Sequence, residues 1–506
     1  MKKRCRQYLT ALVAAGSLLA PWSSAYCASL SVQDAVNIAM ENNLLIKIQE
    51  KGEETARAIL KDARGRNSIS LSAGGDISLT KRSSSDRSST GVGRVGFSLP
   101  IYNGGRNAAN IDSGNLEVQS SYLRTYREME NVRLSVIKAY YDVLEAQKTV
   151  AVRQESVNNY QAHLTNVQQL YSAGSRARID VLRSSVELSN AKQNLIKAEN
   201  SKEISLSTLK NLLLLDPNEP LTLTEDFSYR EFRPDMDSCL TYAMENRKDL
   251  LVDANSLQQK ELAIKSAKAG YYPSISLSMG ANANHYFTSK NDDDQSVNAG
   301  VSISWDIFDS GVTEAAVDRA KAARDIAALT LKKDVNDVDL SVRKAYYNMR
   351  EAEKRFSSTQ AAVGQAEEDY FISREKYRAG EGLMLDIIDA QLALSTAKLN
   401  YISAQYDYAR YKATVENEIG LSVGENVETV LPVEVSAADT KFMEENKRAA
   451  ANLIPEQVLP DADFTLPKRV TYTNNNATAG EPVNNSSEEA ITTTAVNEVE
   501  QNGNEQ

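Results

Sequence analysis

The stretch Lys138-Ala139-Tyr140-Tyr141 recurs as Lys344-Ala345-Tyr346-Tyr347, a shift of 206 residues (344 − 138). The same shift maps Ser68-Ile69-Ser70-Leu71-Ser72 onto Ser274-Ile275-Ser276-Leu277-Ser278. Surface loops normally tolerate insertions, so an unbroken register over roughly 150 residues indicates two halves whose elements must match in length. The sequence therefore predicts one duplicated structural unit.

Composition excludes several classes of protein. The net charge of −11 opposes a nucleic-acid partner, which needs a basic face. Cys5 and Cys27 lie in or beside an N-terminal leader, so Cys239 alone offers no disulfide framework or thiolate metal site. His163 and His285 are far apart, and we expect both to be helix-face or strand residues rather than ligands. No nucleophile–base pair, metal cluster or phosphate loop emerges, so we expect no enzyme activity, metal or cofactor.

The first 28 residues resemble a secretory signal peptide. Basic residues precede an apolar stretch from Leu9 to Ala20, and small residues follow near Ala25 to Ala28. Cys27 leaves open a lipid-modified N-terminus, although the bulky Tyr26 before it disfavours that processing. No later stretch of 18 apolar residues occurs, so any entry into a membrane is expected to be by strands.

Two segments alternate apolar and polar residues with the period of a β-strand. In the first repeat Ile69 and Leu71 alternate with serines, and in the second Ile275, Leu277 and Met279 do the same. Polar loops divide each segment into a hairpin, which predicts strands at about 67–101 and about 273–307. A soluble sheet has the same pattern, but no leftover amphipathic helix is available to cover the apolar face.

A change of direction follows each hairpin. Pro100, Gly104 and Gly105 form the first strand–helix junction, and Gly311 lies in the second. Beyond them we expect helices at about 106–172 and 312–378, each roughly 100 Å long at 1.5 Å per residue. Heptad spacing continues into return helices at about 180–215 and 386–420. Gly174 and Gly380 are expected at the tips of these two antiparallel coiled-coil hairpins.

The sequence is thus divided into five parts. The expected division is a signal peptide (1–28), a first repeat (29–216), a proline-containing linker (217–236), a second repeat (237–430) and a disordered, acidic and Asn-rich C-terminal region (431–506).

Four strands per chain cannot close a barrel, because a transmembrane barrel needs about eight. Three copies would supply twelve strands, and their hairpin arms would form a hollow helical cylinder. We therefore predict an α+β membrane protein whose trimer has a 12-stranded outer-membrane β-barrel continued by an α-helical periplasmic barrel.

The chain resembles the TolC family of outer-membrane efflux proteins from about Leu30 to Val430. The resemblance is carried by Leu99-Pro100-Ile101-Tyr102-Asn103-Gly104-Gly105, by Tyr171-Ser172-Ala173-Gly174 with Asp180-Val181-Leu182, and by Asn190-Ala191-Lys192. It implies a homotrimeric duct in the outer-membrane lipids, with a long periplasmic portion. Its partners would be a periplasmic adaptor (membrane fusion protein) and an inner-membrane transporter. It would serve multidrug efflux or type I secretion, expelling drugs, toxic small molecules or polypeptides.

The resemblance also implies a periplasmic gate. Asp386 and Asp389 match the aspartate rings of the family's constriction, although solvated surface acids are the alternative reading of both. Asp180 and Tyr377 match positions that latch the closed state. Gly382 stands where the family has an arginine donor.

A second departure concerns Ile179, which stands where the family has a hydroxyl residue. Arg176 and Arg178 are alternative donors for the latch. Gly174 and Gly380 match the tips to which an adaptor docks.

Two other protein classes stay open at this stage. A periplasmic coiled-coil adaptor shares the helical hairpin, but it carries compact β-domains and lacks two hairpins with apolar faces. A structural coiled-coil scaffold has no need of alternating strands. The exported substrate and the particular pump and adaptor are not encoded in any motif of the chain.

Overall fold

The computed structural model describes residues 28–80, 88–287 and 293–431. All of them belong to one compact unit, Met1–Val458. The expected signal peptide, Cys27 and the C-terminal region beyond Leu431 lie outside the described residues, so the expectations for them stay predictions.

Four strands form one antiparallel sheet in the order β2-β3-β5-β6. Their bounds are β2 Ser70–Thr80, β3 Ser88–Asn103, β5 Ser274–Tyr286 and β6 Asp294–Ser304. The sequence indicated two separate hairpins, and the pairing of β3 with β5 joins them across the repeat boundary. As a result β2 and β6 are both edge strands.

The register of the sheet separates apolar from polar side chains. Directly opposite residues share a face, and successive pairs align Leu71 with Phe97, Phe97 with Met279, and Met279 with Ala299. The next row on the opposite face consists of Ser72, Gly96, Gly280 and Asn298. On the apolar face the side chains of Leu71, Ile77, Leu79 and Val297 are at least 75% exposed, so no described segment covers it.

The two strands that lead into the long helices, β3 and β6, end at different points relative to β5. β3 continues to Asn103 because a bulge between Pro100 and Tyr102 keeps it paired with β5, whereas β6 ends at Ser304. Ser304 is already opposite the first residue of β5, Ser274, so β6 has no partner beyond it. A proline is tolerated at a bulge because no ladder hydrogen bond is required there.

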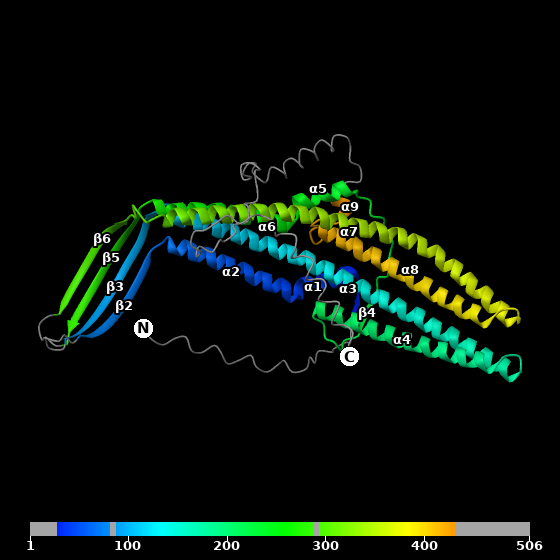
Figure 1. Cartoon of the computed structure of the whole chain (residues 1–506). Coiled ribbons are helices and arrows are strands. Elements are labelled where there is room, and N and C mark those ends of the chain that lie inside the picture. Colours follow the sequence, from blue (N-terminus) through cyan, green and yellow to red (C-terminus); the bar gives the residue numbers. More distant parts are fainter. Residues whose placement is uncertain (1–27, 81–87, 288–292, 432–506) are drawn as a thin grey trace, which may run out of the picture. The chain divides into compact units, whose positions relative to one another are not determined.

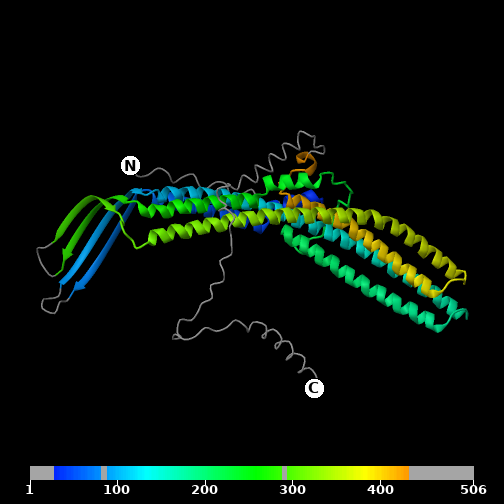
Figure 2. The same cartoon turned by 45° about the horizontal axis from the view of Figure 1, so that its top comes forward.

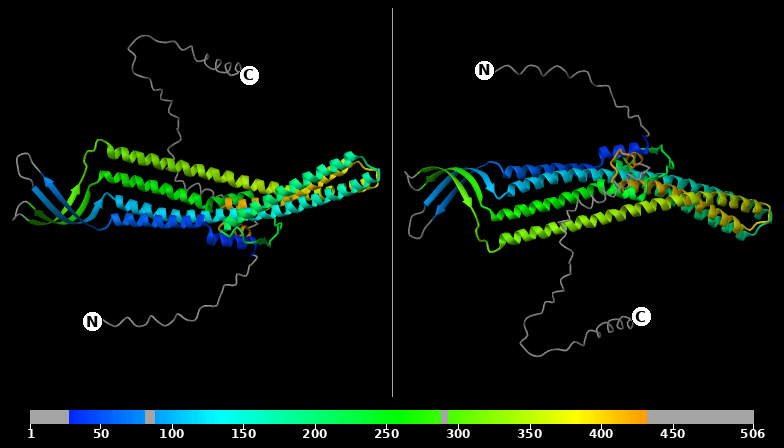
Figure 3. Two further views of the ribbon diagram at one scale, coloured as in Figure 1. Left: turned by 90° about the horizontal axis from the view of Figure 1, so that it is seen from below. Right: turned by 90° about the horizontal axis from the view of Figure 1, so that it is seen from above.

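Two helices of 67 residues dominate the structure, α3 (Arg106–Ser172) and α7 (Val312–Arg378). At 1.5 Å per residue each is about 100 Å long. Each turns back into a shorter helix, α4 (Arg178–Leu213) or α8 (Met384–Glu418). In all views the strands lie at one end of α3 and α7 and the two hairpin turns at the other (Figure 1, Figure 2 and Figure 3). Among the described residues, no helix combines the length and apolarity that crossing a bilayer requires.

The neighbours of α3 and α7 change along their length. In the half near the sheet the order is α2-α3-α6-α7, and in the half near the turns it is α4-α3-α8-α7 (Figure 1). The added helices are α2 (Leu44–Arg66) and α6 (Lys248–Lys268). Thus α2 follows α4 end to end in one row, and α6 follows α8 in another.

Smaller elements surround the middle of the rods. They are β1 Ala28–Leu30, α1 Val32–Asn42, β4 Leu221–Leu223, α5 Met236–Asn246 and α9 Val427–Val430. A 3-10 turn at Ala269–Tyr271 lies instead at the sheet end, between α6 and β5. β1 and β4 pair in parallel, so part of the expected linker is a strand. Tyr140 of the duplicated motif is fully buried here, and its hydroxyl donates to the Leu30 carbonyl at 2.9 Å.

Asn43 joins α4 to α2. Its side-chain oxygen accepts from the Leu45 amide at 2.8 Å and caps α2, while its amide group donates to the Leu212 carbonyl at 3.3 Å in the last turn of α4. One buried side chain therefore satisfies free backbone groups at both helix ends.

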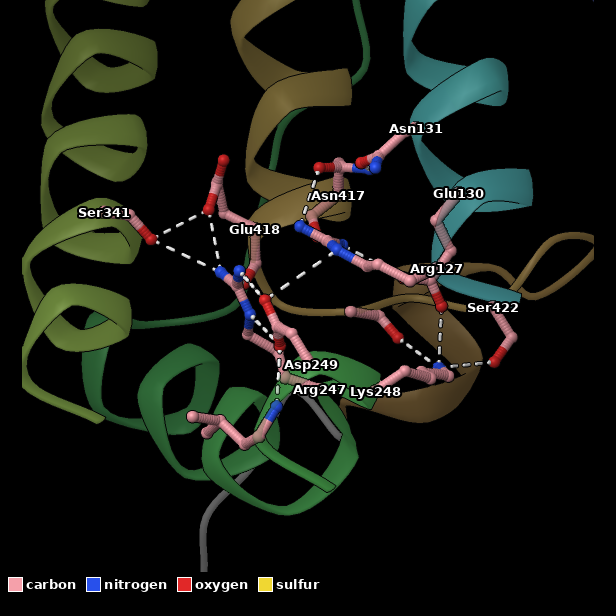
Figure 4. Close-up of polar contacts among 12 residues, drawn as sticks. Arg127, Glu130, Asn131, Arg247, Lys248, Asp249, Ser341, Asn417, Glu418 and Ser422 are labelled. Carbon is pink, nitrogen blue, oxygen red and sulfur yellow. Dashed lines mark hydrogen bonds and ion pairs between the residues drawn. The ribbon is translucent and has the colours of Figure 1, made fainter. Parts of the chain in front are cut away.

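The joint between α8 and α6 is ionic (Figure 4). Arg247 donates to the Glu418 carbonyl at 3.0 Å and to its carboxylate at 2.8 Å, and it also pairs with Asp249. Burial raises the pKa of Asp249, but the hydrogen bond and charge of Arg247 outweigh burial and hold that pKa below its ordinary value. A cation at the end of α8 also complements the helix dipole.

A second pair of cations extends this cluster to α3. Glu130 is only 2% exposed, and its carboxylate lies 3.0 Å from Arg127 and 2.7 Å from Lys248. Lys248 also donates to the Gly420 carbonyl at 2.8 Å. Three cations and three carboxylates thus meet in the half-buried middle of the rods, where their charges cancel.

We predict that Asn43→Ala destabilises the protein by about 1–2 kcal/mol, because the change leaves backbone groups at two helix ends unpaired. Asn43→Ser keeps a cap for α2, but its side chain is too short to reach the Leu212 carbonyl. Its melting temperature should therefore lie between those of Asn43→Ala and the parent. The measurement is thermal denaturation of the purified protein in detergent. The exposed neighbour Asn42 is the matched control. Equal melting temperatures for Asn42→Ala and Asn43→Ala would contradict the stabilising role of Asn43 between α4 and α2.

Candidate gate and docking site at the hairpin tips

Both hairpins turn on a glycine in the left-handed conformation. Gly174 has φ +75° and Gly380 has φ +84°. In each turn the amide after the glycine reaches back to a carbonyl of the preceding helix, from Ser175 to Leu170 at 2.9 Å and from Glu381 to Lys376 at 3.0 Å. These are Schellman-type helix ends, in which a side chain on the glycine costs backbone strain.

The junction residues lie at the opposite end of the rods. Gly104, Gly105 and Gly311 all have positive φ, and Pro100 is at the bulge of β3. A Cβ on Gly104 would lie 2.7 Å from the Ala269 carbonyl oxygen, so the sheet and α6 approach each other closely there. These four residues position the strands against the long helices. They lie at the sheet end of α3 and α7, and the hairpin tips lie at the other end.

Tyr377 is the contact between the two hairpins at the tips. Its side chain is 1% exposed, whereas the matching Tyr171 is 45% exposed. The guanidinium carbon of Arg176 lies 4.4 Å from the centre of the Tyr377 ring, and the His163 ring centre lies 5.4 Å from it. Arg176 and His163 belong to the α3–α4 hairpin, so that hairpin clasps a side chain of α7.

Two buried polar atoms of this contact have no hydrogen-bond partner among the described residues. They are the Tyr377 hydroxyl and Nε2 of His163. Asp180 therefore does not bond to Tyr377, although it acts on it electrostatically. Burial raises the pKa of Tyr377, with Arg176 opposing and Asp180 adding to the increase. Burial lowers the pKa of His163, and Asp180 partly offsets that effect.

The departures from the family's latch have a structural basis here. A Cβ on Gly382 would lie 2.9 Å from the Tyr377 backbone nitrogen, so any side chain at this position forces the turn to move. Ile179 is exposed. Of the two alternative arginines, Arg176 contacts the Tyr377 ring, while no described contact links Arg178 to it.

Asp386 and Asp389 are exposed in the first turns of α8. The Asp386 carboxylate accepts from the Leu383 amide at 3.1 Å, so it also caps the helix. Neither carboxylate has a salt bridge within the described part of the chain. Their charges are therefore not neutralised within one copy. This is compatible with both interpretations, a ring of charges at a constriction and a pair of solvated surface acids.

An exposed apolar seam accompanies each tip. On α4 it consists of Ile179, Leu182 and Val186, and on α8 Leu385 and Leu392 are its exposed members at the same repeat positions. The 3-4 spacing is that of a coiled-coil surface without a partner helix. The tip motif directs attention to the glycines and does not reveal this seam. A second set of apolar residues at heptad spacing, beside the buried set, is the sequence signal that does.

Metal binding has no support from this geometry. Within the described ranges, no group of three or more His, Cys, Asp or Glu residues is placed to hold a metal ion.

The family model of the outer membrane efflux protein matches residues 35–213 and 240–421. The chain is 22% identical to the outer membrane protein TolC of Vibrio cholerae over 362 residues, which are 70% of this chain and 81% of that protein. It is 30% identical to the protein CyaE of Bordetella pertussis, over 33% of this chain and 35% of CyaE. It is 22% identical to the alkaline protease secretion protein AprF of Pseudomonas aeruginosa, over 56% of this chain and 60% of AprF.

Solved structures share the fold. The CmeC outer membrane channel of Campylobacter jejuni has a TM-score of 0.69 at 17% identity, over 82% of this chain and 89% of CmeC. The open state of the MtrE outer membrane channel of Neisseria gonorrhoeae has a TM-score of 0.64 at 20% identity, over 77% of this chain and 88% of MtrE. Because the family model matches well over half of the chain, one segment in each repeat, the chain belongs to the family of outer membrane efflux proteins.

Proposed function

We propose that three copies of this chain form an exit duct in the outer membrane. It passes drugs, toxic small molecules or polypeptides from a periplasmic adaptor and an inner-membrane transporter to the exterior. The observation that carries the proposal is a four-stranded sheet with two unpaired edges and an uncovered apolar face.

Lipid satisfies no backbone hydrogen bond, so the edges β2 and β6 need strands from other copies. Three copies supply twelve strands and close the sheet. The apolar face then meets lipid, and the Ser-, Gly- and Asn-rich face lines the lumen, where Arg94 and Asp76 pair at 3.1 Å. Exposed aromatic side chains near the sheet–helix junction suit an interfacial girdle: Tyr102, Tyr271, Tyr272, Trp305 and Phe308.

The helices have matching free sides. In both halves α7 is at one side of the row, while α2 and α4 are at the other. Apolar residues are exposed on both sides, including Ile326 and Leu329 on α7 and Ile48 and Ile59 on α2. We infer that α7 of one copy packs against α2 and α4 of the next.

Cross-linking of the purified protein in mild detergent should therefore stop at trimers. Leu329→Glu should weaken the trimer, because it buries a charge against the next copy. Saturation at dimers, or equal trimer yields for Leu329→Glu and the parent, would contradict this assembly.

At the tips, the exposed seams of α4 and α8 suit the helical hairpin of an adaptor, which supplies the missing partner helix. The glycine turns hold the two seams in place. Docking on this end leaves the lumen continuous with the transporter.

Gly380→Val is expected to strain the turn by about 1–2 kcal/mol, the cost of a left-handed non-glycine residue. It should weaken export while trimers persist, and Gly174→Val should act alike. Accumulation of a fluorescent efflux dye in the native host measures export. Gly364 lies within α7 with open space at its Cβ position, so Gly364→Ala is the control. Full export by both valine variants would place docking elsewhere.

The gate proposal rests on charge. Asp386 and Asp389 from three copies would place six carboxylates at one narrowing. Like charges so close together attract cations and hold them.

Asp386→Asn with Asp389→Asn removes six charges per trimer at nearly constant shape. Conductance in planar bilayers should then lose its cation preference and its block by multivalent cations from the periplasmic side. The side-chain amide of Asn also retains an oxygen for the Leu383 cap. Unchanged block and selectivity would identify both residues as ordinary surface acids.

A further inference from the structure

Tyr377 is held by two side chains from the other hairpin. Arg176 lies over its ring at 4.4 Å, and His163 contacts it at 5.4 Å between ring centres. Val167 of α3 and Met384 and Ile387 of α8 complete the apolar cluster around it. If the α7–α8 hairpin moves away from the α3–α4 hairpin, the Tyr377 side chain must leave this position. We name Arg176, Tyr377 and His163 the clasp.

His163 carries the side chain of the clasp whose ordinary pKa lies nearest to neutral pH. Its Nε2 atom is buried and has no hydrogen-bond partner among the described residues. The groups around it are Asp180 on α4, Arg176 in the turn and Tyr377 on α7. Asp180 acts electrostatically on the imidazole and favours its charged form, whereas burial opposes it.

Proton uptake would disturb the clasp in two ways. It places an N–H donor at the buried Nε2 atom, which has no acceptor among the described residues, and it places a positive charge on a buried ring. Asp180 compensates only in part, since burial holds the pKa of His163 below its ordinary value. The separated hairpins, with a solvated imidazole of ordinary pKa, therefore bind the proton more tightly. The contact is strongest above that ordinary pKa and weakens as the pH falls through it.

We propose that the clasp is a proton-sensitive fastening of the periplasmic end of the duct, released when His163 becomes charged. The inference rests on the proposed exit duct. It adds a regulatory input, the proton concentration of the periplasm.

Planar-bilayer conductance at about pH 7.5 and about pH 5 tests the clasp, since this range spans the titration of imidazole. All variants carry Asp386→Asn and Asp389→Asn, so that these two positions are uncharged at both pH values. The parent should gain conductance severalfold in acid. His163→Phe keeps a ring against Tyr377 but takes up no proton, so it should stay at the neutral-pH conductance. His285→Phe, which changes the other histidine, should respond as the parent does.

An equal acid response in His163→Phe and the parent would overturn the proposal. A second measurement does not depend on the channel. Hydrogen exchange of the tip segments 160–180 and 370–385, corrected for the intrinsic pH dependence, should accelerate in acid in the parent and not in His163→Phe. Equal acceleration in both would also overturn it. If the parent shows no channel conductance in planar bilayers, the proposed exit duct is contradicted. The hydrogen-exchange experiment still decides whether His163 controls the opening of the tips.

Discussion

The unpaired backbone groups of β2 and β6 are the constraint on which the rest of the molecule depends. In the proposed duct, a sheet with two open edges persists in lipid only if identical sheets continue it, so each chain would have to present complementary edges at fixed positions. The edge strands belong to different repeats, and the long helices behind them, α3 and α7, have the same length of 67 residues. Equal lengths keep both hairpin tips at one level, which explains why the repeat register tolerates so few insertions.

A continuous wall also requires helices that replace one another along the rods. The two replacements use different chemistry: Asn43 joins α4 to α2 with neutral hydrogen bonds, and Arg247 joins α8 to α6 within a balanced ionic cluster. Breaking the ionic joint would leave buried charges unpaired, which costs more than losing a neutral cap. The α8–α6 row is therefore the more tightly specified of the two, and it connects directly to the aspartates at the start of α8.

Much of this architecture could be predicted from periodicity, because heptads and alternation are local signals. They indicated α3, α7 and the strand pairs, and φ of Gly174 and Gly380 agrees with their expected turn positions. The pairing of β3 with β5 and of β1 with β4 could not be predicted, since no local pattern encodes which distant segments meet. Arg176 and Arg178 were equal alternatives in the sequence for the same reason, and the structure places Arg176 over the Tyr377 ring. The gate and docking roles of the site residues stay predictions.

The two repeats share one sequence pattern, but their hairpin tips make different contacts. Tyr171 and Tyr377 occupy the same repeat position, yet only Tyr377 is buried between the hairpins. Its partners Arg176 and His163 have Gly382 and Asp369 at the matching positions of the other repeat, so that repeat cannot build the same contact. Because Gly382 packs against the Tyr377 backbone, a bulky residue there would displace the tyrosine. The two repeats therefore differ where their hairpins meet: only the α3–α4 hairpin carries the side chains that enclose Tyr377, and Gly382 leaves the room that the tyrosine backbone needs.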